Sequence, residues 1–326
     1  MIYIRPEFFS DFKCIAEKCT DSCCIGWEIG VDSNTKEKYE KIKTPFGKKV
    51  MENIVKSEDG GVVFKLGENE RCPFLNDNNL CDIIINCGEE NICYICKEHP
   101  RFYNDYANAT EYGLGLCCEE VCRLLIETDE PLNFLIEEYE DEDICFEYNE
   151  FESYKKVYAL REKIYGILKL DVSYNDKIQK IIDFIEIEFN EQPKLLSDEE
   201  LLKAYKNTEP INNEWVEYFN SLYVDIKRIQ EKEKPFDISS NGDKKYSKIL
   251  SYIVFRHLMN SIYTDSFSLV KCLSFCISGV RFIKLCDIKS YIENGELTLS
   301  ERINNIKRWS KQIEYSDENI DILTFI

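Results

Sequence analysis

The sequence lacks a long uninterrupted apolar run. Its first residues, MIYIRPEFFSDFK, contain no continuous apolar stretch of the kind found in secretory signals. The most apolar stretches, 249–255 and 269–282, contain or border the charged residues Arg256, Lys271 and Arg281. Neither stretch reaches the roughly 20 apolar residues that a membrane-spanning helix needs. We therefore expect a cytoplasmic protein with no transmembrane segment, in a compartment where thiols stay reduced.

Basic residues are also in short supply. The chain has 41 Lys and Arg against 61 Asp and Glu, which gives a formal net charge of −20. A nucleic-acid partner requires a basic face that neutralises phosphates, so this balance argues against one. The negative charge either accelerates the approach of cationic partners or only keeps the protein soluble. The charge alone leaves both alternatives open.

Cysteine, by contrast, is abundant and unevenly distributed. Sixteen of the 326 residues are cysteine, and twelve of these precede Arg123. The first four, Cys14, Cys19, Cys23 and Cys24, form a C-x4-C-x3-C-C pattern. A vicinal pair rarely closes a disulfide on itself, because the short ring strains the bridge. Zinc and iron–sulfur clusters usually take four thiolates, so the pattern favours a metal or cluster site over a group of inert buried thiols.

A second group of cysteines lies between residues 72 and 96. Cys72 and Cys81 bracket a polar turn, 76–79, which would bring both sulfurs to one side. Cys93 and Cys96 have C-x-x-C spacing, which suits either a metal-binding corner or a redox pair. A thiol oxidoreductase that uses this pair is therefore an alternative function.

Two polar residues follow these thiols. His99 is a possible fourth ligand, although a packed or exposed histidine fits it better. Arg101 could either donate hydrogen bonds to a thiolate cluster or form a surface ion pair.

The third group begins at a predicted helix start near Cys117 and Cys118. A thiol at a helix N-terminus has a lowered pKa and becomes a ready ligand, and Cys118 and Cys122 would share one helix face. The preceding Gly113-x-Gly115 is too short to be a nucleotide-binding fingerprint. We interpret these glycines as a place where the backbone packs closely against a neighbouring group, and the cluster is one candidate for that group.

The order of these motifs resembles the flagellin lysine-N-methylase (FliB-type) family. The resemblance covers about the first 125 residues, with C-x4-C-x3-CC-x2-W, then CPFL-x5-C, then GEE-x5-C-x3-PR. The matching residues are Cys14, Cys19, Cys23, Cys24 and Trp27; Cys72–Leu75 and Cys81; Gly88–Glu90, Cys96, Pro100 and Arg101; and Leu114, Leu116, Cys118, Glu120, Arg123 and Leu124. The same half resembles, more loosely, small Cys-rich proteins that chelate iron or zinc.

This resemblance implies a protein lysine N-methyltransferase that acts on flagellin lysine ε-amino groups. It implies S-adenosylmethionine as methyl donor and a Cys-ligated iron–sulfur cluster, of the 4Fe-4S type, with zinc as the other candidate metal. The implied metal ligands are Cys14, Cys19, Cys23, Cys24, Cys72, Cys81, Cys96 and Cys118. Four thiols fall outside the family pattern, namely Cys87, Cys93, Cys117 and Cys122, and so does His99, where the family usually has an aromatic residue.

The cofactor site rests on the resemblance alone. No glycine-rich loop of the Rossmann-like methyltransferases follows a predicted strand. The C-x3-C-x2-C triad of common radical enzymes is absent, because the first thiols are spaced by four and then three residues. A non-catalytic zinc- or iron-binding module fused to a helical interaction domain is therefore the alternative function.

The rest of the chain predicts helices. Residues 137–152 hold nine acidic side chains, which is typical of a connecting segment or a surface helix, although docking of a basic partner is the alternative. Helices are expected near 154–168 and 178–189, from a capping box at 197–200, and near 213–232, 246–263, 266–286 and 298–313, the fourth ending before Pro235, with a loop at 239–242. Overall we expect a mainly α protein with minor β structure. A Cys-rich metal-binding module, 1–125, would precede a C-terminal helical bundle, 126–326.

Overall fold

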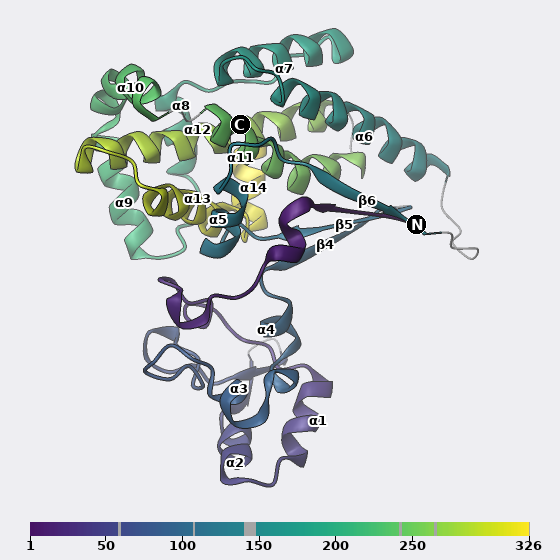
Figure 1. Ribbon diagram of the computed structural model, residues 1–326, viewed down its shortest axis with the longest axis vertical. Coiled ribbons are helices and arrows are strands. Elements are labelled where there is room, and N and C mark those ends of the chain that lie inside the picture. The colour runs from purple at the N-terminus through teal and green to yellow at the C-terminus, as the bar shows by residue number, and fades with distance from the viewer. Residues whose placement is uncertain (58–59, 107, 140–147, 241–242, 264–265, 326) are drawn as a thin grey trace. The chain divides into compact units, whose positions relative to one another are not determined.

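The computed structural model describes residues 1–326 except 58–59, 107, 140–147, 241–242, 264–265 and 326 (Figure 1). Its described elements are α-helices α1–α14, short 3-10 turns, one four-stranded sheet and one two-stranded sheet. This confirms the prediction of a mainly α fold with minor β structure. Among the described residues, no helix combines the length and the apolar character needed to cross a membrane.

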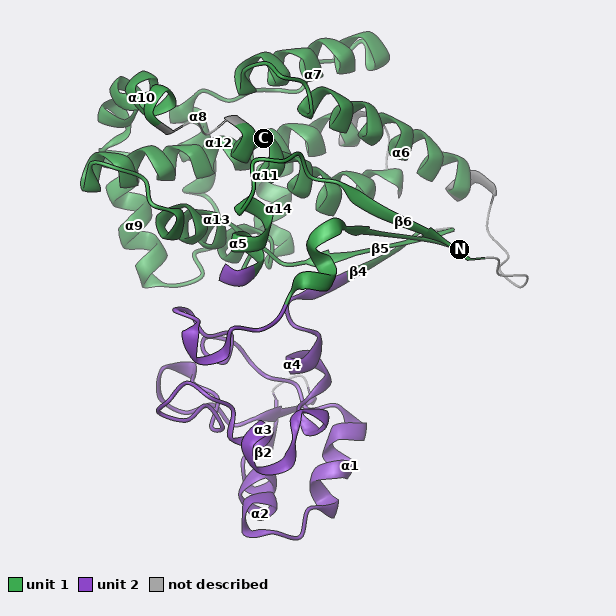
Figure 2. Ribbon diagram, viewed as in Figure 1, with its two compact units in different colours: residues 1–12, 103–117, 121–326 green, residues 13–102, 118–120 purple. Residues whose placement is uncertain are grey.

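The chain forms two compact units that alternate along the sequence (Figure 2). Unit 1 contains Met1–Phe12, Tyr103–Cys117 and Val121–Ile326, and unit 2 contains Lys13–Phe102 and Cys118–Glu120. The first twelve residues belong to unit 1 because their strand completes its sheet. The division expected from cysteine content was 1–125 and 126–326. It is based on composition alone, so it does not account for the first strand, which belongs to the sheet of unit 1.

The sheet of unit 1 has the strand order β4-β5-β1-β6. Its strands are β1 (Ile2–Pro6), β4 (Arg101–Tyr106), β5 (Ala109–Leu114) and β6 (Phe134–Glu138). β1 runs parallel to β5, with Ile2 beside Ala109, and antiparallel to β6, with Ile4 beside Ile136. No local pattern in the sequence predicted this sheet.

The helices of unit 1 form the bundle expected for the second half of the chain (Figure 1). They are α5 (Glu119–Ile126, whose first turn lies in unit 2), α6 (Tyr148–Leu168), α7 (Tyr174–Phe189), α8 (Asp198–Tyr205), α9 (Asn213–Val224), α10 (Ile226–Ser240), α11 (Asp243–His257), α12 (Ser266–Asn294), α13 (Leu299–Ile313) and α14 (Asp317–Thr324). α11 and α12 carry the most fully buried side chains, including Phe255, Phe275 and Phe282. These two helices therefore form the centre of the bundle.

Pro235 does not end a helix, and here the prediction was wrong. The expected helix 213–232 is broken at Asp225 into α9 and α10, and α10 continues through Pro235 to Ser240. Proline in a helix interior removes a backbone hydrogen bond and clashes with the preceding turn. Side-chain contacts offset this cost, because Phe236 is fully buried and the residues around it pair with α12.

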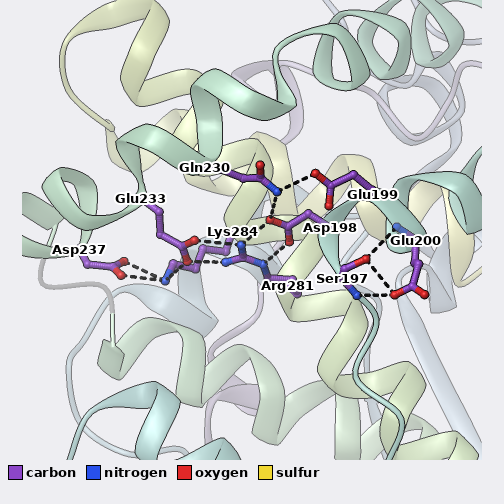
Figure 3. Close-up of polar contacts among 9 residues, drawn as sticks. All are labelled: Ser197, Asp198, Glu199, Glu200, Gln230, Glu233, Asp237, Arg281 and Lys284. Atoms are coloured by element: carbon purple, nitrogen blue, oxygen red, sulfur yellow. Dashed lines mark hydrogen bonds and ion pairs between the residues drawn. The ribbon is translucent and has the colours of Figure 1, made fainter.

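Figure 3 shows the polar contacts that hold α10 against α12 and α8. Arg281 of α12 pairs with Glu233 of α10, and its Nε lies 2.7 Å from Asp198 Oδ1 of α8. Lys284 Nζ lies 3.0 Å from Glu233 Oε1 and 2.8 Å from Asp237 Oδ1. These carboxylates flank Pro235, so the ion pairs hold the helix in place on both sides of the proline.

The acidic segment 137–152 is divided between several parts of the structure. Glu137 and Glu138 belong to β6, and Glu150 and Glu152 to α6, whereas 140–147, including Cys145, lie outside the described residues. Of the expected loop 239–242, the first two residues end α10 and the other two also lie outside the described residues.

Unit 2 is built from short elements around a small core. They are α1 (Ser33–Lys41), α2 (Pro45–Glu52), β2 (Ile54–Lys56), β3 (Val62–Phe64), α3 (Asp82–Cys87) and α4 (Tyr94–Glu98). Asp32 caps α1 by accepting a hydrogen bond from Thr35 N (2.9 Å). Tyr39, Phe64 and Phe74 fill the core, with Cys72 and Cys93 buried among them. The thiols are therefore part of the packing of this unit.

Candidate metal-binding site

The loop 72–81 presents two thiols toward each other. A hydrogen-bonded turn closes it, because Asn76 Oδ1 accepts from the backbone N–H groups of Asn78 (2.9 Å) and Leu80 (3.1 Å). Burial, with smaller contributions from the Cys24 and Cys81 thiols, raises the pKa of the Cys72 thiol to about 12. The polar turn therefore brings the two sulfurs to one side of the loop.

Backbone N–H groups point at both of these sulfurs. Those of Phe74 and Leu75 donate to the Cys72 sulfur and favour its thiolate, against the effect of burial. Those of Ile83 and Ile84 do the same for Cys81. Such N–H···S bonds are a usual feature of thiolate metal sites, where they stabilise the ligand's negative charge.

Cys24 joins the first cysteine segment to this loop. Its carbonyl oxygen accepts a hydrogen bond from Cys72 N (2.8 Å). A hydrogen bond donated by the Cys23 thiol lowers the pKa of Cys24 to about 7, with help from the Ser22 hydroxyl and the Arg71 charge. These contacts bring the pKa of Cys24 close to neutral pH.

Arg71 is a site residue that the sequence analysis missed. Its guanidinium donates to Leu75 O (3.2 Å) and Asn76 O (2.7 Å), and these bonds fix its charge inside the loop. From there it favours the Cys24 thiolate. In the sequence, only its position immediately before Cys72 indicates that Arg71 could lie near the thiols.

Cys93 and Cys96 form a close pair beside the loop. The Cys96 thiol donates a hydrogen bond to the Cys93 sulfur, which lowers the pKa of Cys93, and the Tyr39 hydroxyl lies 3.7 Å from the same sulfur. This hydrogen bond and burial raise the pKa of Cys96, and the charges of Cys24 and Cys72 raise it further. Cys93 lies outside the family pattern, but its C-x-x-C spacing places it in the same thiol group.

The remaining predicted ligands lie around Cys23. The hydrogen bond to Cys24 raises the pKa of Cys23, and the nearby Cys14 and Cys118 thiols raise it further. Cys118 is held near this segment by its neighbour Glu119, whose carboxylate accepts from Thr20 N (3.0 Å). The Cys19 thiol donates to the carbonyl of Asp21 (3.3 Å).

The thiols therefore gather in two overlapping groups within unit 2. The outer group contains Cys14, Cys23 and Cys118, the inner group contains Cys72, Cys81, Cys93 and Cys96, and Cys24 adjoins both. Every described cysteine is a free thiol. Within the described residues, no three His, Cys, Asp or Glu side chains lie close enough together to hold a metal ion in this arrangement. The donor chemistry suits zinc and iron–sulfur clusters, which prefer soft thiolates.

Other candidate residues have structural partners. His99 packs against the Trp27 ring at 5.7 Å between centroids. Arg101 donates to Lys97 O (3.1 Å). In unit 1, His257 is buried with its Nε2 2.8 Å from Glu314 Oε1, so it is a hydrogen-bonded core residue.

Two expectations around residues 113–122 require correction. The peptide of Leu114, inside Gly113-x-Gly115, bonds to Tyr252 of α11 through both its N–H (2.7 Å) and its carbonyl (2.6 Å), so this stretch belongs to the core of unit 1. Cys122 is fully buried and donates to Leu116 O (3.0 Å), so it does not share a ligand face with Cys118.

Comparison with known proteins identifies relatives for part of the chain. A flagellar biosynthetic protein FliU from Salmonella muenchen is 29% identical over 131 residues, which cover 38% of this chain and 78% of that protein. A protein named lysine-N-methylase from Salmonella choleraesuis and another from Salmonella typhimurium are each 28% identical over 131 residues. The chain spans 33% of the length of these two.

No family model and no solved structure matches the chain. The named relatives nevertheless bear out, over 38% of the chain, the resemblance to the flagellin lysine-N-methylase family that the cysteine spacing indicated.

Proposed function

We propose that this protein is a lysine N-methyltransferase that acts on the ε-amino groups of flagellin lysines. S-adenosylmethionine is the methyl donor, and the thiols of unit 2 hold an iron–sulfur cluster on which activity depends. Two observations support the proposal: relatives named lysine-N-methylase are 28% identical to this chain over 131 residues, and thiols from separate segments of unit 2 influence one another electrostatically.

The expected ligands are the eight thiols of the family pattern. Cys14, Cys19, Cys23, Cys24, Cys72, Cys81, Cys96 and Cys118 would hold the metal, and Cys93 adjoins them. The backbone N–H groups at Cys72 and Cys81 already favour the thiolate form that a metal ligand requires. When bound, the cluster would supply an electron-transfer centre and a covalent tie between the three segments.

Methyl transfer places its own demands on the chain. The lone pair of a neutral lysine nitrogen attacks the methyl carbon, the carbon–sulfur bond breaks toward sulfur, and the product ammonium then loses a proton. Positioning and amine deprotonation therefore contribute most of the rate. The net charge of −20 attracts a lysine-bearing substrate and a cationic donor, although the same field raises the lysine pKa.

A direct test uses protein that is purified without oxygen. We expect stoichiometric iron, sulfide and a thiolate-to-iron absorption band, together with transfer of labelled methyl from S-adenosylmethionine to flagellin. Cys24→Ser and Cys118→Ser should lose both metal and transfer, whereas Cys272→Ser on α12 should keep both. Bound metal without methyl transfer would instead support the non-catalytic metal-binding module. Absence of metal, with one reactive pair at Cys93 and Cys96, would support the oxidoreductase.

A further inference from the structure

The four-stranded sheet of unit 1 has one covered and one exposed face. Burial alternates along its strands: Ile4 on β1 and Glu111 on β5 are buried, whereas their neighbours Tyr3 and Tyr112 are only partly buried. The covered face packs on helices, as the pairing of Glu111 with Arg161 of α6 shows (2.7 Å). The outer face of the sheet therefore carries the side chains that alternate with the core.

Tyrosines dominate this outer face. Tyr3 and Tyr139 meet edge to face at 5.5 Å, and Tyr103 and Tyr112 stack at 5.9 Å. Tyr103 is 50% exposed and Tyr139 is 58% exposed, so both present ring surface to solvent. We call the set Tyr3, Tyr103, Tyr112 and Tyr139 the tyrosine face. Exposed aromatic side chains gathered in this way are typical of protein interaction surfaces.

The charges around the tyrosine face favour a cationic occupant. Arg5 lies among the rings, but Glu137 neutralises it at 2.8 Å and also accepts from the Tyr139 hydroxyl (3.1 Å). Asp105 on β4, whose carboxylate accepts from the Thr110 hydroxyl on β5 (2.7 Å), adds negative charge to the same face. A second copy of this chain, itself carrying a charge of −20, would be repelled. Lysine side chains, by contrast, place their apolar stems on tyrosine rings and their ammonium groups near carboxylates or ring faces.

We propose that the tyrosine face is a docking surface for a lysine-bearing segment of the protein substrate. The identity of that substrate rests on the function proposed above. The surface lies on paired strands, in which Tyr3 lies beside Thr110 of β5 and Glu137 of β6, two residues before Tyr112 and Tyr139 respectively, so the rings form a preordered platform. The tyrosine face would bind the substrate polypeptide, and it includes none of the thiols of unit 2.

Binding of flagellin to the metal-loaded full chain, measured by calorimetry without S-adenosylmethionine, tests this proposal. Tyr103→Ser with Tyr139→Ser should raise Kd about tenfold, since each lost cation–π and stem contact contributes a few-fold. Tyr103→Phe with Tyr139→Phe keeps the rings and should bind nearly as the wild type does. Tyr223→Ser on α9 removes a tyrosine of similar exposure, 42%, and should leave Kd unchanged. Far-ultraviolet circular dichroism confirms folding of each variant.

The outcomes separate this proposal from the proposed function. Unchanged Kd in the double serine variant, with normal methyl transfer and unchanged KM, would overturn the docking surface and leave the enzymatic function standing. Tyrosine-dependent binding without any methyl transfer would support the docking surface and contradict the enzymatic function. Higher added salt should weaken wild-type binding, because ammonium–carboxylate attraction is screened.

Discussion

At the scale of single residues, His257 links the stability of unit 1 to pH. Burial lowers the pKa of this imidazole below its usual 6.5, although Glu314 opposes the shift. As pH falls below 6.5, His257 therefore becomes protonated in the unfolded chain while it stays neutral in the folded protein. Stability is fully present above that pH and is lost below it, by up to about 1.4 kcal/mol per pH unit.

His257→Gln should remove this part of the pH dependence. Glutamine can still donate to Glu314 but has no proton to gain, so its free energy of unfolding should fall less between pH 7 and pH 5. Urea unfolding of both proteins at the two pH values measures the difference. Identical losses in variant and wild type would show that His257 does not carry the effect.

The thiol of Cys24 should react before its neighbours in metal-free protein. The hydrogen bond from Cys23 lowers its pKa to about 7, and thiolates are the reactive form. Alkylation by iodoacetamide, followed by peptide mass spectrometry, should show a rate that rises with pH through a midpoint near 7. Cys24→Ser should abolish this phase. Cys87→Ser should retain it, because burial raises the pKa of Cys87.

At the scale of elements, Gly279 sets the spacing between α12 and α13. A Cβ at this position would lie 2.6 Å from Cζ2 of Trp309, whose indole is fully buried and donates to the Tyr205 hydroxyl (2.7 Å). Gly279→Ala should therefore destabilise the protein by about 1–3 kcal/mol, the usual cost of overpacking a core.

Gly166 on α6 provides the matched control. A Cβ there meets nothing within 4 Å, so Gly166→Ala should stabilise the protein by about 0.5–1 kcal/mol through helix propensity. Chemical denaturation measures both variants. A loss of stability in Gly166→Ala equal to that in Gly279→Ala would refute the close-approach argument.

Local chemistry allowed the capped helices to be predicted, but not the sheet. The capping boxes Ser197–Glu200 and Thr298–Glu301 begin α8 and α13 as expected, because all their partners lie within one turn. The sheet pairs residues as distant in sequence as Ile2 and Ala109, and no local pattern encodes such a contact. The continuation of α10 through Pro235 depends in the same way on ion pairs with a distant helix.

In the candidate site, too, some features follow from the local sequence and others depend on distant contacts. Cysteine density indicated that the thiols are metal or cluster ligands, since few other roles explain it, and it left open whether they form one site or two. The positions of Arg71 and Cys93 depend on how the loop 72–81 folds back beside Cys24, and residue spacing does not contain that information. The assignment of thiols to an inner and an outer group likewise required the fold.

At the scale of the whole molecule, the two units differ in what holds them together. Unit 1 buries long helices such as α11 and α12 around a continuous aromatic core. Unit 2 has described helices of five to nine residues and a core that includes thiols. The thiols of unit 2 come from segments far apart in the sequence, and the described ones are free. A metal bound to them, as proposed above, would tie these segments together.

Removal of the metal should therefore unfold unit 2 while unit 1 persists. If thiolate–metal bonds join 14–24 to the loop 72–81, the free energy of ligation is also free energy of folding for this unit. After treatment with a strong chelator, amide hydrogen exchange should become fast across α1, α2 and β3, whereas α11 and α12 should keep their protection. Cys24→Ser should reproduce this pattern without chelator, and Cys272→Ser should exchange as the metal-loaded wild type does. Unchanged protection of α1 and α2 after complete metal loss would mean that the apolar core around Tyr39 and Phe64 is sufficient to fold unit 2.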